Sequence, residues 1–271
     1  MDQLFLIKLA LSFITGAVVV AFSTVISERI GTRFGGIFAA MPNTIIVTSV
    51  FIAWTQDAAA AVEATRSMPV AIIGVFCYLI AYYYSSLKFP KSFLKPIILA
   101  LFAWFATVVL GSFLKLDMLL LGAGVAIFSI PAFIVLFGQP PNPQAKKPKA
   151  SNSELLMRGI LGGLVVCAAV IVTKYLSIFY GGSMGAFPAV LTSSFAILHY
   201  RHGSGFVREF MRTVPFGTVG LFVFAYSANQ FYLVRGVILG TFYGWILSAI
   251  CILILYLSIP RFFDYASFFK R

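Results

Sequence analysis

Nine long apolar stretches constrain this chain more than any other feature of its sequence. A helix needs about 20 consecutive apolar residues to cross the hydrocarbon core of a bilayer, and nine stretches meet that length at least roughly. The predicted spans are Leu4–Ser27, Phe34–Trp54, Pro69–Leu87, Leu94–Phe113, Met118–Gly138, Leu155–Leu176, Gly181–Leu198, Val214–Val234 and Gly236–Ile259. Apolar residues make up 61% of the chain and charged residues 10%, against about 45–50% and 25% in a soluble domain. This composition excludes an ordinary soluble enzyme, and the predicted fold class is all-α, a polytopic helical membrane protein.

Basic residues predict how the nine spans are oriented. Lys and Arg are enriched in cytoplasmic loops. With the N-terminus outside, only Lys8, Arg66, Lys115, Lys174 and Arg235 of the 20 basic residues fall on the outer side. The other fifteen fall inside, so we expect an integral membrane protein with its N-terminus outside and its C-terminus in the cytoplasm. The net charge of +12 is explained by this topology, and nucleic acid is not an expected partner.

The chain contains an internal repeat with an offset of 146 residues. Without a gap between residues 35 and 76, nine of the 42 pairs are identical when the chain is compared with itself at this offset. The identical pairs are Gly35/Gly181, Gly36/Gly182, Ala40/Ala186, Pro42/Pro188, Glu63/Glu209, Arg66/Arg212, Pro69/Pro215, Gly74/Gly220 and Phe76/Phe222. Most of these are Gly, Pro, Glu or Arg, which match by chance less often than the abundant apolar residues.

The span count predicts that the two repeats have opposite orientations. We expect a four-helix repeat over residues 1–116, a linking span and a basic cytoplasmic linker over 117–153, and a second four-helix repeat over 154–271. Because five spans separate equivalent points, the second unit is inverted, which gives a 4+1+4 inverted-topology repeat. Inverted repeats are a recurrent architecture of secondary transporters.

A Gly-Gly pair followed by proline begins the second and the seventh predicted spans. Proline breaks or kinks a helix, so Pro42 and Pro188 predict helix breaks. The free amides of a helix N-terminus favour an anion, so one interpretation is a solute site near the midplane that includes Gly35, Gly36, Gly181 and Gly182. The alternative is a kinked helix whose glycines serve only close packing.

Polar side chains follow each of these prolines. They are Asn43, Thr44, Thr48 and Ser49 in the first unit and Thr192, Ser193 and Ser194 in the second. These groups are candidates for coordinating a polar solute or ion between the units. The alternative is that the hydroxyls bond back to their own helix or to a neighbouring one.

Two Glu-x-x-Arg pairs, Glu63/Arg66 and Glu209/Arg212, precede the third and eighth spans. Spacing i,i+3 places the partners on one helix face. We expect them to act as gating or anion-guiding pairs on short interfacial helices at opposite mouths. An ion pair that only anchors the chain at the interface is the alternative.

Signatures of catalysis and metal binding are missing from the sequence. Cys77, Cys167 and Cys251 lie apart in apolar stretches, and His199 and His202 fall in a predicted basic loop without a carboxylate at ligand spacing. We therefore expect no enzyme activity, no metal and no cofactor.

The second unit resembles a known family. The run from Gly181 to Pro188, followed by Glu209–Thr213, is similar to the GlpM-like family of small four-span bacterial inner-membrane proteins. The resemblance implies two such units fused through an extra helix and located in a bacterial inner (plasma) membrane. It implies a fold more than an activity. The layout is also similar to fused fluoride channels of the Fluc type, but their Asn and Thr-Phe-Ser-Thr-Phe pattern has no match here.

These features predict a membrane transporter for a small polar or anionic solute that works by alternating access of two inverted repeats. Its partners would be the lipid bilayer, the solute and, in a homo-oligomer, further copies of the chain. An ion channel of antiparallel architecture and a non-transporting scaffold or lipid-handling protein are the alternatives.

Overall fold

The computed structural model is all-α over the residues that it describes, which are 3–30, 32–114, 117–137 and 151–268. The helices are α1 (Gln3–Ile30), α2 (Thr32–Ala39), α3 (Asn43–Thr55), α4 (Ala58–Lys88), α5 (Leu94–Ser112), α6 (Met118–Phe137), α7 (Asn152–Tyr175), α8 (Ile178–Gly185), α9 (Ala189–His202), α10 (Ser204–Met211), α11 (Val214–Arg235) and α12 (Val237–Phe268). Most predicted spans agree with these bounds to within a few residues. The predicted linker lies outside the described residues up to residue 150.

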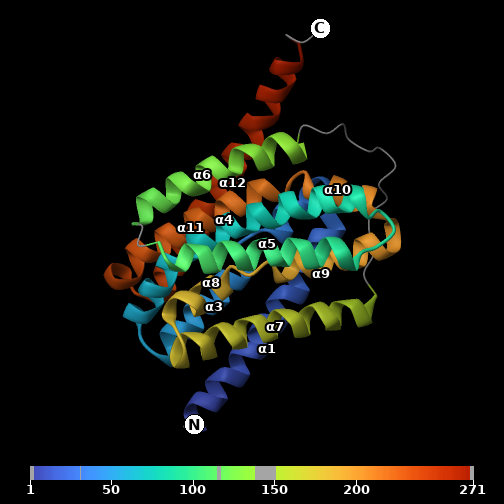
Figure 1. The fold of residues 1–271 in the computed structure, drawn as a ribbon. Helices are drawn as coiled ribbons and strands as arrows, with labels where there is room; N and C mark the ends of the chain where they lie inside the picture. The colour runs from blue at the N-terminus through green and yellow to red at the C-terminus, as the bar shows by residue number, and fades with distance from the viewer. Residues whose placement is uncertain (1–2, 31, 115–116, 138–150, 269–271) are drawn as a thin grey trace.

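Two helix pairs, each with one member from either half of the chain, organise the bundle (Figure 1). α1 packs against α7, and α4 packs against α11. α5 covers α4, α12 covers α11, and α6 packs against both α4 and α11. The C-terminal end of α12 extends beyond the rest of the bundle.

Small residues allow α1 and α7 to approach closely. A Cβ on Gly16 would lie 2.8 Å from Cγ2 of Val166, and a Cβ on Gly162 would meet the side chain of Val20. Helices in a bilayer gain little from hydrophobic burial against one another, so van der Waals contact at small residues stabilises such pairs. The two contacts are reciprocal, because Gly162 and Val166 lie 146 residues after Gly16 and Val20.

Both predicted helix breaks are present. α2 ends at Ala39 and α3 begins after Pro42, while α8 ends at Gly185 and α9 begins after Pro188. Proline has no amide hydrogen to continue the preceding helix, and its fixed φ suits the start of the next one. The axes of α8 and α9 differ by 44°.

Helix length and hydropathy support fewer membrane spans than the nine predicted from the sequence. Among the described residues, seven helices are long and apolar enough to cross a membrane, or eight if the bent pair α8–α9 is one span. α11 falls short because its glycines, hydroxyls and the amides of Asn229 and Gln230 lower its hydropathy, although half of it is buried against other helices. The chain is therefore an integral membrane protein with seven or eight candidate spans in contact with lipid.

The two predicted interfacial helices differ from each other in the structure. Residues 58–67 are not a separate helix, because α4 continues through Pro69 without a break. The equivalent segment of the second half is the separate helix α10, which starts after Gly203. Gly203 has a φ of +81°, a backbone conformation that ends α9 and that side chains with a Cβ rarely adopt.

Candidate functional site

A small cavity lies between the two helix breaks. Its volume is about 30 Å³, which is room for one or two water molecules. Residues from both breaks and from the central helices α4 and α11 line it: Ala39, Ala40, Met41, Thr44, Ile45, Val75, Ala186, Phe187, Pro188, Ala189, Val190, Leu191 and Leu221. Pairs at the 146-residue offset recur among them, such as Ala40 with Ala186 and Val75 with Leu221, so the two halves contribute similar walls.

The first turns of both helices that follow the prolines contribute residues to this wall. In the first turn of α3, the amides of Asn43 and Ile46 donate to the carbonyl oxygens of Met41 and Pro42. The amides of Thr44 and Ile45 have no carbonyl partner within their own helix, as is usual in a first turn. Both of these residues line the cavity.

The same arrangement recurs at the start of α9. The amides of Ala189 and Thr192 donate to Phe187 and Pro188, which leaves those of Val190 and Leu191 without a helical partner. These two residues also line the cavity. Two helix N-termini, each with a partial positive charge, therefore meet at one small space.

Few of the predicted polar side chains reach this cavity. Among Asn43, Thr44, Thr48, Ser49, Thr192, Ser193 and Ser194, only Thr44 lines it. The Ser193 hydroxyl bonds back to the carbonyl oxygen of Val190 at 3.1 Å, and Asn43 Nδ2 lies 3.4 Å from the carbonyl oxygen of Phe38. Thr48 is fully buried, and its methyl group lies 3.1 Å from where a Cβ on Gly185 would be.

The paired glycines contact helices rather than the cavity. A Cβ on Gly35 would lie 2.6 Å from the carbonyl oxygen of Ser27, and one on Gly181 would overlap Thr173. Gly36 packs against Phe210 and Thr213, and Gly182 packs against Ala64 and Ser67. The packing interpretation therefore accounts for the glycines, while residues that follow the prolines line the cavity.

The two Glu–Arg pairs form, but their exposure differs. Arg66 and Glu63 lie 2.9 Å apart with side chains 61% and 53% exposed, whereas Arg212 and Glu209 lie 3.2 Å apart and are each 15% exposed. A hollow of about 410 Å³ adjoins the exposed pair. We call it the vestibule, and its lining residues are Glu63, Arg66, Ser67, Val70, Leu114, Asp117, Leu121 and Phe179.

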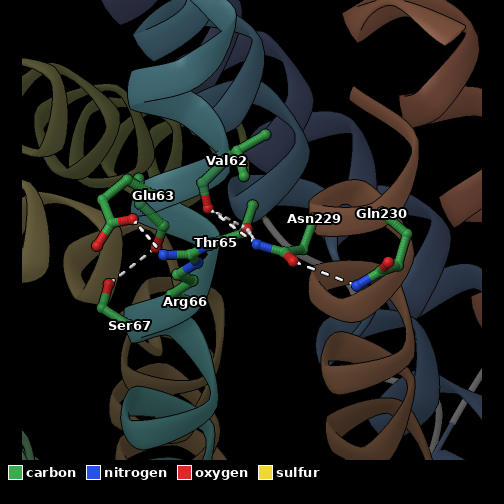
Figure 2. A network of polar contacts seen from close by, with 8 residues as sticks. Val62, Glu63, Thr65, Arg66, Ser67, Asn229 and Gln230 are labelled. Atoms are coloured by element: carbon green, nitrogen blue, oxygen red, sulfur yellow. Dashed lines mark hydrogen bonds and ion pairs between the residues drawn. The ribbon is translucent and has the colours of Figure 1, made fainter. Parts of the chain in front are cut away.

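A polar network links α4 to α11 beside the vestibule (Figure 2). Asn229 Nδ2 donates to the carbonyl oxygen of Val62 at 3.1 Å and to the hydroxyl of Thr65 at 3.0 Å. Gln230 in turn donates to Asn229. The sequence analysis did not identify Asn229, although an amide inside an apolar stretch is a usable signal for an interhelical bond.

The structure buries two side chains, those of His199 and Arg158, that the sequence analysis did not predict to be buried. His199, predicted in a loop, lies in the last turn of α9 at 4% exposure. Arg158, one of the fifteen basic residues predicted on the inner side, is 1% exposed within α7. Polar residues at span ends were difficult to place because hydropathy does not locate a helix end to within one turn.

Within the described residues, no group of three His, Cys, Asp or Glu side chains lies close enough together to hold a metal ion. The cysteines are free thiols. Among the residues that line the cavity, the polar groups are those of the backbone and the side chain of Thr44.

Comparison with known proteins identifies one family domain. Residues 9–115 match the family described as "Protein of unknown function (DUF3147)". This range covers most of the first predicted repeat. No curated protein and no solved structure matches the chain, so the resemblance to the GlpM-like family remains a prediction.

Proposed function

We propose that the protein is a membrane transporter that moves a small polar or anionic solute by alternating access of two inverted repeats. The observation that carries the proposal is the cavity at which the two broken helices meet. Backbone amides at helix N-termini bind anions and polar oxygens without a cationic side chain. In a bilayer, non-helical backbone is tolerated where it lines a cavity, and discontinuous helices of this kind form solute sites in secondary transporters.

An inverted duplication is supported by the spacing of the helices. α8 begins and ends 146 residues after α2 begins and ends, and α3 and α4 start 146 residues before α9 and α10. The reciprocal glycine contacts add tertiary support, because Gly36 with Phe210 and Gly182 with Ala64 are equivalent pairs at the same offset. A pseudo-two-fold relation between the halves explains both facts.

The proposed orientation places the N-terminus outside a bacterial inner membrane and the C-terminus in the cytoplasm. The vestibule and the Glu63–Arg66 pair then lie on the outer side, and the Glu209–Arg212 pair lies on the cytoplasmic side. Tags inserted at 31–34 and at 177–180 test this directly, since the inverted arrangement requires them to be accessible from opposite faces.

Flux in proteoliposomes tests the function. Purified protein is reconstituted and assayed with inorganic anions, small carboxylates and neutral polar solutes. Saturable uptake that Pro188→Ala and Arg212→Ala both reduce would support the proposal. Equal flux in all three proteins, or no flux across the panel, would count against it, and unitary currents in single-channel recordings would favour the channel alternative.

A further inference from the structure

Two glycine contacts between the halves of the chain define two seams. In the first seam, Gly182 of α8 packs against the carbonyl oxygen of Ala64 and the hydroxyl of Ser67 of α4. In the second seam, Gly36 of α2 packs against the carbonyl oxygen of Phe210 and the hydroxyl of Thr213. The contacts are so close that a single added methyl group would overlap backbone atoms in either seam.

The first seam connects the vestibule with the central cavity. Phe179 of α8 lines the vestibule, and Ala186, which directly follows the end of α8, lines the cavity. On α4, Ser67 and Val70 line the vestibule, and Val75 lines the cavity. Ser67 and Val75 are eight residues apart on α4 and therefore share a helix face, which places the first seam between the two spaces.

Small and flexible groups close this route. Gly182 lies against Ser67, and Gly185 lies against Thr48, with Cε of Met68 3.5 Å from where a Cβ on Gly185 would be. Only van der Waals contact joins these groups. These groups of α4 and α8 can therefore move apart without breaking an ion pair or a hydrogen bond between them.

Buried hydroxyl groups lie at both seams. The hydroxyls of Thr48 and Ser183 at the first seam and of Thr213 at the second have no hydrogen-bond partner among the described residues. Burying a hydroxyl without a partner is unfavourable. Water or a polar solute that enters an opened seam would satisfy these groups, which favours opening over a permanently dry contact.

The two seams are not equally covered in this structure. The Glu63–Arg66 pair near the first seam is mostly exposed and faces the vestibule, whereas the Glu209–Arg212 pair near the second seam is 15% exposed. In an inverted repeat, each half adopts in turn the conformation of the other. When the second seam opens, its residues are therefore expected to adopt the exposed arrangement that the first seam has in this structure.

We propose that the first and second seams are the two gates of the central cavity, and that they open alternately. The proposal rests on the proposed transport function and specifies its mechanism. When the second gate opens, a vestibule equivalent to the one at α4 forms around Glu209, Arg212, Thr213 and Phe216. In the present state both gates are closed, and the vestibule reaches the first gate at Ser67 and Val70.

Thiol labelling tests the gates without measuring flux. Cys77, Cys167 and Cys251 are replaced by alanine, and Ser67→Cys, Val75→Cys or Thr213→Cys is added as a single reporter. A small membrane-impermeant methanethiosulfonate reagent is applied to right-side-out or inside-out vesicles. We expect the reporter at 67 to react only from the vestibule face, the reporter at 213 only from the opposite face, and the reporter at 75 from either face.

A disulfide lock supplies the second arm. Gly185→Cys with Thr48→Cys closes the first gate, because a Cβ on Gly185 would lie 3.3 Å from Cβ of Thr48, close to the Cβ separation in a disulfide. The oxidised lock should abolish labelling at 75 from the vestibule face only, and dithiothreitol should restore it. If the double variant does not fold, the single reporters decide.

Three outcomes would overturn the gates: labelling at 67 and 213 from the same face, no labelling at 75 from either face, or labelling that persists through an oxidised lock. Labelling tests the gates and flux tests transport, so the two proposals can fail independently. The expected labelling pattern without flux for any solute would refute transport but not the gates. Saturable flux with any of the three overturning patterns would refute only the gates.

Discussion

The hydroxyl of Tyr82 lies 2.8 Å from Nδ1 of His199, in a contact that joins the first half of the chain to the second. Nε2 of the same ring lies 3.0 Å from the carbonyl oxygen of Pro90. A carbonyl oxygen only accepts hydrogen bonds, so Nε2 carries a proton and, in the neutral ring, Nδ1 accepts from Tyr82. Both ring nitrogens are thereby satisfied at a buried position that links α4 and α9.

We predict that Tyr82→Phe destabilises the fold by about 1–2 kcal/mol, because it leaves a buried imidazole nitrogen without its donor. The measurement is the thermal unfolding midpoint in detergent, which should fall. The matched control is Tyr84→Phe, which removes a hydroxyl from an exposed neighbouring tyrosine and should leave the midpoint unchanged. Equal midpoints for both variants would show that the His199 contact does not stabilise the fold.

Gly36→Val and Gly182→Val should both prevent folding. Each places a branched side chain where a single Cβ already overlaps a carbonyl oxygen of the opposite half, and the surrounding backbone cannot yield without separating two helices. The measurement is the monodisperse fraction in size-exclusion chromatography after membrane extraction. Gly205→Ala is the control, since the nearest atom to its Cβ would be 3.8 Å away. Normal yield of either valine variant would contradict the close approach.

The sequence predicted the framework of this fold better than its chemistry. Apolar length located most of the helices, and Pro42 and Pro188 located both breaks, because these signals are local. The roles of Gly36 and Gly182 were ambiguous, since only the position of Phe210 and Ala64 in the opposite half decides between a ligand contact and helix packing. Thr44 and Thr48 are four residues apart and share a helix face, yet only Thr44 lines the cavity. Thr48 is instead covered by α8, which contacts it at Gly185.

The two ion pairs should differ in their contribution to stability. Arg66→Gln should have little effect on the unfolding midpoint, because an exposed pair is screened by solvent. Arg212→Gln should lower the midpoint, with a cost of roughly 1–3 kcal/mol, because it leaves the 15% exposed carboxylate of Glu209 without that partner. Differential scanning fluorimetry of both variants in one detergent checks the contrast. A larger shift for Arg66→Gln would contradict the difference in burial.

Thr44→Val should impair transport while preserving the fold. The substitution keeps the size of the side chain and removes the hydroxyl of Thr44, which is the one predicted polar residue that lines the cavity. If that hydroxyl binds the solute, its loss costs roughly 1–1.5 kcal/mol, which corresponds to about a fivefold to 13-fold rise in KM for the solute identified by flux. Thr107→Val is the control, because the Thr107 hydroxyl bonds to its own helix at Ala103, away from the cavity, and should leave KM unchanged. Wild-type KM in Thr44→Val, at an unfolding midpoint equal to that of the control, would mean that the solute is bound by backbone amides alone or at another place in the bundle.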